Sequence, residues 1–182
     1  MANLTRKQIG IALGLLLFII FARSFYVISI TNFYIFHLIK NYGLTISQGQ
    51  LCIFLFLALG AAGTFFGGPM ADKLGRKNVI VLSLAVPIPL CLLLPYVPLL
   101  AVILLLAVIG FIIMLSFSVT VVYAQELVPS KIGTMSGLTV GLAFGMGAIG
   151  SVVIGILMDQ IGIYETMIVI SFLPIIGLVG LG

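Results

Sequence analysis

The chain has 182 residues, of which 63% are hydrophobic and only 7% are charged, and its mean hydropathy is +1.41. A water-soluble domain of this size needs far more polar surface, so the composition excludes a soluble protein and indicates a bundle of membrane-spanning helices. The net charge of +4 does not indicate a nucleic-acid partner, because most of the charges fall in short segments between apolar runs.

Six apolar runs predict an all-α membrane protein with a single domain over residues 1–182. A transmembrane helix needs about 20 apolar residues to cross a hydrocarbon core about 30 Å thick. The sixth run stops at Gly182 without a basic anchor, so we expect either that the native chain continues or that it was cut there. The predicted spans cover residues 9–38, 50–70, 79–94, 99–124, 134–158 and 164–182.

The first run is longer than one span requires. Residues 9–38 would form about 45 Å of helix, so we expect this helix to tilt, to protrude or to break, with residues 29–32 as the expected break. Since successive helical residues lie about 100° apart, several polar side chains of this run share an arc of about 80°. This stripe consists of Arg23, Tyr26, Tyr34 and His37.

The stripe is the best candidate in the sequence for a surface that lines a substrate cavity. A charge near the middle of a span costs about 2.5–3.5 kcal/mol on insertion scales, so Arg23 is expected to face protein or a water-filled cavity. A structural bond from Arg23 to a carbonyl remains the alternative. His37 is either a proton carrier or an interfacial residue, and aromatic packing alone would also explain Tyr26 and Tyr34.

The second run leads into the segment 67–77, GGPMADKLGRK, which carries four charges. Two apolar helices must be joined there by a short basic turn that cannot enter hydrocarbon, so this turn marks one membrane surface. In the third run, Pro87 and Pro89 predict a kink, because the apolar character continues on both sides. The fourth run has no charge, and Ser116, Thr120 and Tyr123 share one of its faces, which makes them further cavity-lining candidates.

No acidic residue lies in the interior of any of the six predicted spans. Glu126 follows the fourth run, where an ion pair with Arg76 or Lys131 is the expected role and proton transfer is the alternative. Asp72, Asp159 and Glu165 also lie at span ends or in loops. The sequence therefore displays no obvious site for proton coupling within the membrane.

The fifth run carries glycines at a spacing of four residues, Gly133, Gly137, Gly141 and Gly145. Small residues in lipid let two helix backbones approach closely, so this run is predicted to be a contact helix. Two interpretations stay open at this point. The stripe forms either a moving interface with a second six-helix unit or a static contact inside this bundle.

No arrangement of residues indicates an enzyme. The sequence has no set of Ser, His and acidic residues, no metal-ligand cluster and no phosphate-binding glycine loop, so we expect no catalytic residues, no metal and no cofactor. Cys52 and Cys91 both lie within apolar runs, where a thiol behaves as a small hydrophobic group.

Basic residues are distributed unequally between the two sides of the predicted bundle. Positive residues concentrate on the cytoplasmic side of membrane proteins, so the distribution predicts a multi-pass protein of the inner (plasma) membrane with both termini in the cytoplasm. Only Lys40 falls on the opposite side from Arg6, Lys7, Lys73, Arg76, Lys77 and Lys131.

Two segments resemble a known family. The pattern G-x-x-x-D-K-x-G-R-K resembles the signature loop of the major facilitator superfamily, and in this chain it comprises Gly68, Asp72, Lys73, Gly75, Arg76 and Lys77. YAQELVPSKIG at residues 123–133 and GLAFGMGAIG at residues 141–150 resemble the second six-helix half of fosmidomycin-resistance-type drug efflux proteins.

The resemblance implies one half of a twelve-helix exporter that alternates access by rocking, driven by proton antiport. In such halves the first and fourth helices line the cavity, the second and fifth contact the other half, and the third and sixth face lipid. The halves of this family are parallel repeats, so the implied partners are lipid, a small-molecule substrate and a second half, supplied by a homodimer or by a longer transporter. The competing hypothesis is a non-transporting assembly module, or a fragment that is inactive without its partner half.

The resemblance also implies a contact between the halves. In the family, the acidic residue of the signature loop lies near the cytoplasmic start of the facing half's fifth helix, where the positive end of the helix dipole favours a carboxylate. Asp72 is accordingly expected to contact residues 131–136 of the second half.

Overall fold

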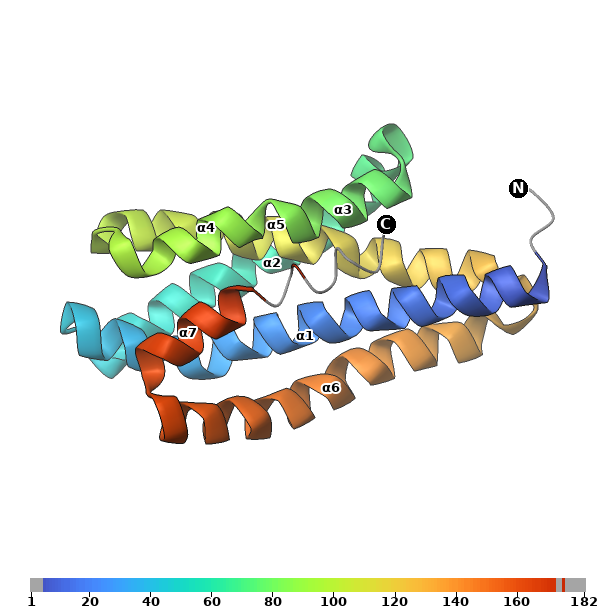
Figure 1. The fold of residues 1–182 in the computed structure, drawn as a ribbon. Helices are drawn as coiled ribbons and strands as arrows, with labels where there is room; N and C mark the ends of the chain where they lie inside the picture. The colour runs from blue at the N-terminus through green and yellow to red at the C-terminus, as the bar shows by residue number, and fades with distance from the viewer. Residues whose placement is uncertain (1–4, 173–174, 176–182) are drawn as a thin grey trace.

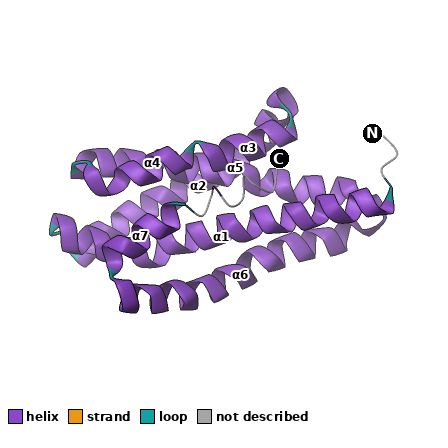
Figure 2. Ribbon diagram, in the orientation of Figure 1, coloured by secondary structure: helices purple, strands orange, loops and turns teal. Residues whose placement is uncertain are grey.

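The computed structural model describes residues 5–172 and residue 175. These residues form helices joined by short turns, with no strand in the described part of the chain (Figures 1 and 2). The α-helices are α1 (Arg6–Tyr42), α2 (Ile46–Leu74), α3 (Arg76–Ala85), α4 (Pro87–Leu93), α5 (Leu99–Leu127), α6 (Ile132–Ile161) and α7 (Ile163–Ser171).

Five segments of the described chain are long and apolar enough to cross a membrane, namely Arg6–Tyr42, Ile46–Leu74, Arg76–Tyr96, Leu99–Leu127 and Pro129–Ile161. Helix α7 covers the beginning of the sixth predicted span, and residues 173–174 and 176–182 of that span lie outside the described residues. The prediction of an all-α membrane protein is confirmed.

Helix α1 is continuous, so the break expected at residues 29–32 is wrong. The hydroxyls there bond back to their own helix: Ser29 Oγ donates to the Phe25 carbonyl at 2.5 Å, and Thr31 Oγ1 donates to the Val27 carbonyl at 2.9 Å. The helix stays continuous through these residues because their hydroxyls form hydrogen bonds to carbonyls of the same helix and need no partner outside it. Its 37 residues give about 55 Å of helix, which must tilt or protrude from the membrane.

The third span is divided as its prolines predicted. Helix α3 ends at Ala85 and α4 begins at Pro87, with Val86 between them in a helical conformation (φ −67°, ψ −40°). Proline lacks the amide hydrogen and crowds the preceding turn, which produces a kink rather than an end.

A single residue, Gly75, connects α2 to α3. Helix α2 continues past the predicted end at residue 70 and includes Pro69, and it stops at Leu74 because Gly75 takes φ +88°, a conformation that disfavours side chains. The start of α1, this turn and the α5–α6 turn lie at the same end of the bundle (Figure 1).

Helix α1 lies between α6 and the pair formed by α2 and α5 (Figure 1). In that pair the two backbones touch: a Cβ atom on Gly63 would overlap the carbonyl oxygen of Phe111, and one on Gly67 would overlap that of Leu115. Gly110 of α5 makes the reciprocal approach to the backbone of α2. Only glycine permits this crossing, which holds the bundle together without large side chains at the contact.

Candidate functional site

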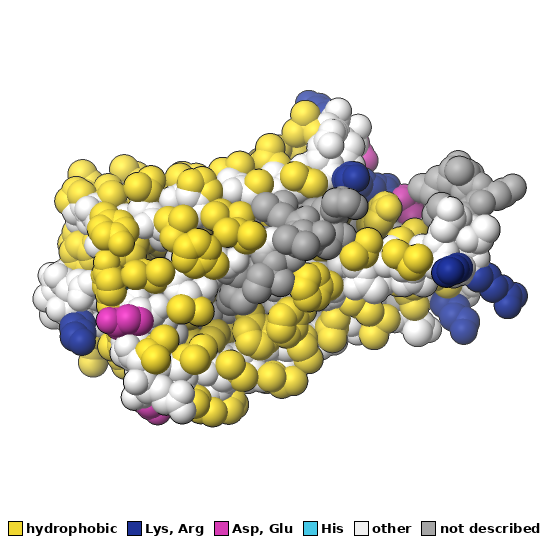
Figure 3. Space-filling view, viewed as in Figure 1, with side chains coloured by type: hydrophobic (Ala, Val, Ile, Leu, Met, Phe, Trp, Pro, Cys, Tyr) yellow, Lys and Arg dark blue, Asp and Glu magenta, His cyan; other side chains and the backbone are white. Residues whose placement is uncertain are grey.

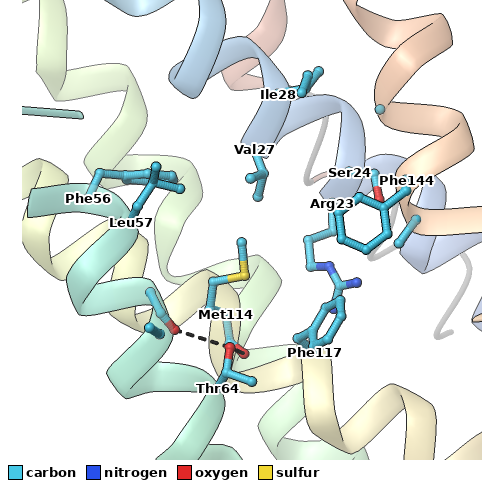
Figure 4. A pocket seen from close by; sticks show the side chains of 14 residues that line it. Arg23, Ser24, Val27, Ile28, Phe56, Leu57, Thr64, Met114, Phe117 and Phe144 are labelled. Carbon is cyan, nitrogen blue, oxygen red and sulfur yellow. Dashed lines mark hydrogen bonds between the residues drawn. The ribbon is translucent and has the colours of Figure 1, made fainter. Parts of the chain in front are cut away.

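A cavity of about 350 Å³ opens between α1, α2, α5 and α6 (Figure 4). Two larger hollows, of about 470 and 420 Å³, have no charged side chain among their lining residues. The cavity of about 350 Å³ does have a charged side chain in its wall, and its other lining groups are mainly apolar. Its walls are Arg23, Ser24, Val27 and Ile28 from α1, Phe56, Leu57, Gly60, Ala61 and Thr64 from α2, Met114 and Phe117 from α5, and Ala143, Phe144 and Gly147 from α6.

Arg23 supplies the charge of the cavity. Its side chain reaches from α1 toward Phe117 of α5, with Cζ 4.9 Å from the centre of the aromatic ring (Figure 4). The residue is only 3% exposed, and its Nη1 atom has no hydrogen-bond partner in the described part of the chain. A guanidinium over an aromatic face gains some electrostatic stabilisation, but the ring satisfies none of its donors in the way that an oxygen acceptor does.

Tyr26 and Tyr34 belong to the same predicted stripe as Arg23, but they do not line its cavity and pack inside the bundle instead. The Tyr26 hydroxyl lies 2.5 Å from Cys91 Sγ of α4. Both tyrosines border a void of only about 10 Å³, which is too small for a substrate. The structure therefore does not bring the predicted stripe into one cavity, because an arc of about 80° on α1 spans two different helix neighbours.

His37 also lies in the interior, with 1% of its surface exposed. Its ring stacks on Tyr34 at a centroid distance of 5.2 Å and on Tyr164 of α7 at 6.3 Å. Asn41 Nδ2 lies 3.2 Å from His37 Nε2. This arrangement places the imidazole in a packed aromatic cluster, away from the cavity that holds Arg23.

The polar face predicted for α5 does not line the cavity. Ser116 and Thr120 are fully buried, and their hydroxyls donate to carbonyls three residues earlier in the same helix, at 3.1 and 2.9 Å. Tyr123 is half-buried and packs against the second hydrophobic cluster of the core. Met114 and Phe117 occupy the cavity wall instead.

Within the signature turn, Arg76 is half-buried, and its guanidinium forms an ion pair with Glu126 at the end of α5. Arg76 was one of the two partners expected for Glu126, and Lys131 is not used. Figure 3 shows lysine and arginine side chains gathered at the end of the bundle where α1 begins. The remaining charges of the turn, Asp72, Lys73 and Lys77, lie on the surface, while Gly68 is half-buried and Gly75 is exposed.

The predicted glycine stripe of α6 faces away from the rest of the described chain. A Cβ atom on Gly133, Gly137, Gly141 or Gly145 would meet nothing within 4 Å. Among the described residues the stripe therefore has no packing partner, and both interpretations of it stay predictions. Helix α6 contacts α1 through a different set, in which Gly150 lies against Ile28 and Phe25.

The profile of the Major Facilitator Superfamily matches residues 3–141. This chain belongs to that superfamily. It is 54% identical over 150 residues to an "Uncharacterized MFS-type transporter", YfnC, of Bacillus subtilis (strain 168), covering 82% of this chain and 37% of the relative. It is 44% identical over 175 residues to the "Fosmidomycin resistance protein" of Escherichia coli (strain K12), covering 96% of this chain and 43% of that relative.

The chain thus spans about two fifths of the length of these relatives. Membership in the superfamily and the long apolar helices indicate a multi-pass membrane protein. The profile and the relatives also confirm the family resemblance inferred from the signature turn.

Sequence reasoning missed most of the cavity wall of this superfamily member. Ser24, Met114 and Phe117 carry no signal of their own, because their positions depend on how α1 and α5 are rotated in the bundle. The α2 contact did have a signal: Gly60, Gly63 and Gly67 recur at helical spacing, as expected for a close helix crossing.

Proposed function

We propose that this chain is one six-helix half of a secondary transporter that exports drugs or other small molecules by alternating access. The observation that supports this proposal is the position of the cavity. It opens among four helices, and two of them, α2 and α6, carry apolar faces without a partner in the described chain. A second half on that side would enclose the cavity and complete a substrate path.

The exposed faces beside the cavity fit a protein partner. Phe65 on α2 is 76% exposed, and Phe144, at the cavity edge on α6, is 74% exposed. Next to Phe144 runs the open stripe that includes Gly141 and Gly145. In lipid, such a stripe gains packing contacts from a second helix that lipid chains do not match as well. The second half is either another copy in a parallel homodimer or the remainder of a longer transporter.

We further propose that the basic end of the bundle lies in the cytoplasm and that the protein resides in the inner (plasma) membrane. The start of α1 and the α2–α3 turn, both at this end, carry Arg6, Lys7, Lys73, Arg76 and Lys77. An excess of basic residues at one end of short connections favours a cytoplasmic location. With six spans, both termini would lie on this side.

Transport by the reconstituted protein tests the proposal. Fosmidomycin is a suitable first substrate because one relative is named for resistance to it. We expect proteoliposomes to move this compound faster than protein-free vesicles, with a pH gradient changing the rate. Ala61→Trp, which fills the cavity, should abolish the difference, whereas Leu100→Trp on the exposed surface of α5 should not.

The mass of the solubilised particle separates the possible partners. A dimeric particle with transport activity supports the homodimer. A monomer that transports nothing, alone or when supplied with the missing half of a longer transporter, would contradict the proposed function and favour a non-transporting module.

A further inference from the structure

Arg23 brings a buried positive charge to the cavity without an acidic partner. It is 3% exposed, and Nη1 is buried without a hydrogen-bond acceptor in the described part of the chain. A buried ion without a partner is strongly destabilising, so an arrangement of this kind is retained where something supplies the opposite charge. The cavity is the space from which that partner can reach the guanidinium (Figure 4).

The chain itself provides no such partner. Of its four acidic residues, Glu126 is paired with Arg76, and Asp72, Asp159 and Glu165 are exposed at helix ends. None of the four lines the cavity. A second copy in a parallel homodimer would bring its acidic residues to the same two ends, again far from the middle of the membrane.

A lipid headgroup is too distant to compensate the charge. Arg23 lies about 25 Å along α1 from Arg6 and about 28 Å from Tyr42, so it sits near the middle of the helix. Phosphate groups lie outside a hydrocarbon core about 30 Å thick, which places them roughly 15 Å from a residue at the centre.

We propose that the cavity binds an amphipathic organic anion, whose acidic group pairs with Arg23 and whose apolar body lies against Val27, Leu57 and Met114. A carboxylate, sulfonate or phosphonate can accept two hydrogen bonds from one guanidinium, and these bonds are strong in a water-poor site. A volume of about 350 Å³ accommodates a molecule of one or two rings. The same charge disfavours cations. This inference rests on the proposed function only for the step of transport and adds the substrate class to it.

Naphthalene-2-sulfonate and the neutral naphthalene-2-sulfonamide are a matched pair of probes, since they share the apolar body. Binding is measured by equilibrium dialysis with the whole chain in phosphatidylcholine nanodiscs, after subtraction of binding to empty discs. We expect the wild type to bind the anion at least about tenfold more tightly than the sulfonamide, as a charge-assisted bond predicts.

Three variants test the assignment to Arg23. Arg23→Met should remove the preference for the anion while changing sulfonamide binding less than threefold, and Arg23→Lys should keep part of the preference. Lys40→Met, which removes a positive charge at the end of α1, should bind both probes as the wild type does. Thermal unfolding of each variant checks the fold. If Arg23→Met does not fold, two results still test the proposal. These are the relative affinity of the wild type for the two probes and the loss of binding of both probes in Ala61→Trp.

Equal affinity of the wild type for both probes overturns the proposal, and so does an anion preference that survives Arg23→Met or disappears in Lys40→Met. The wild type could also bind the anion in phosphatidylcholine nanodiscs but lose it in phosphatidylglycerol nanodiscs. If that loss requires Arg23, the acidic partner of Arg23 is a lipid headgroup, and the proposal is overturned. Binding is measured without a gradient, so its outcome is independent of transport. Transport without anion preference contradicts this inference alone, and anion preference without transport contradicts the proposed function alone.

Discussion

Two glycine-rich helix faces in this molecule have opposite surroundings. On α2, Gly63 and Gly67 lie directly against the backbone of α5, where no side chain fits. On α6, a Cβ atom on Gly137 or Gly141 would meet no described residue within 4 Å. Both faces have the spacing that favours close helix contact in lipid, yet only the first has a partner in the described chain.

The difference shows that glycine spacing identifies a contact surface but not its partner. Helix α5 also contributes a glycine to this contact, Gly110, which lies against the backbone of α2 at Phe56. Helix α6 has no such counterpart among the described residues. The α2–α5 contact therefore joins two helices of the described chain, whereas the α6 stripe has no partner there and is our proposed contact with a second half.

The strongest test of this comparison is Gly63→Ala. The added methyl group would overlap the backbone of α5, so the helices must separate, and we expect a loss of about 1–3 kcal/mol or more in the free energy of unfolding. Gly68→Ala is the matched control on the same helix, because a Cβ atom there meets nothing within 4 Å. Unfolding in mixed detergent micelles measures both, and equal stability of the two variants would contradict the packing.

The second test concerns the open stripe. Gly141→Leu should leave the unfolding free energy nearly unchanged and weaken association with a second half at least about tenfold, because its side chain keeps the two helices apart. Gly10→Leu carries the same change at another open glycine outside the stripe. Energy transfer between labelled copies in bicelles measures association, and loss of folding in Gly141→Leu would show that the stripe packs within the half.

Much of the fold was predictable from apolar run length and proline. The all-α membrane architecture and the kink at Pro87 follow from residues whose effect is local. The break expected at residues 29–32 failed because Ser29 and Thr31 satisfy their hydroxyls on their own helix. A polar side chain in a span indicates a break only when its hydrogen bonds need an outside partner.

The site was less predictable than the fold. Arg23 was found because a central charge needs special surroundings, and the structure does place it in the cavity wall. Ser116 and Thr120 shared a face but turned it into the core. Which face of a helix meets a cavity depends on its neighbours, and neither periodicity nor residue type specifies those neighbours in a chain that is apolar on almost every side.

A smaller effect is expected from Asp72→Asn at the basic end. We propose that Asp72 contacts the start of α6 in the second half, since that helix begins at Ile132 without a side-chain cap and both groups are exposed. A carboxylate near a helix N-terminus contributes modestly, so we expect association to weaken about two- to fivefold, and less at high salt. Asp159→Asn, at the opposite end of α6, should leave association unchanged. An equal effect of both substitutions would reduce the role of Asp72 to net charge.

The smallest effect is expected from the ion pair within the half. Arg76 and Glu126 are 29% and 30% exposed, and partly exposed pairs contribute roughly 0.2–1 kcal/mol, so Arg76→Gln should lower stability by no more than that. A double-mutant cycle with Glu126→Gln measures the coupling, and Lys77→Gln is the control for loss of charge in the same turn. Because this pair joins α3 to α5 of one chain, association should not change. If Arg76→Gln instead weakens association as strongly as Asp72→Asn, the whole turn, and not its carboxylate, forms the contact between halves.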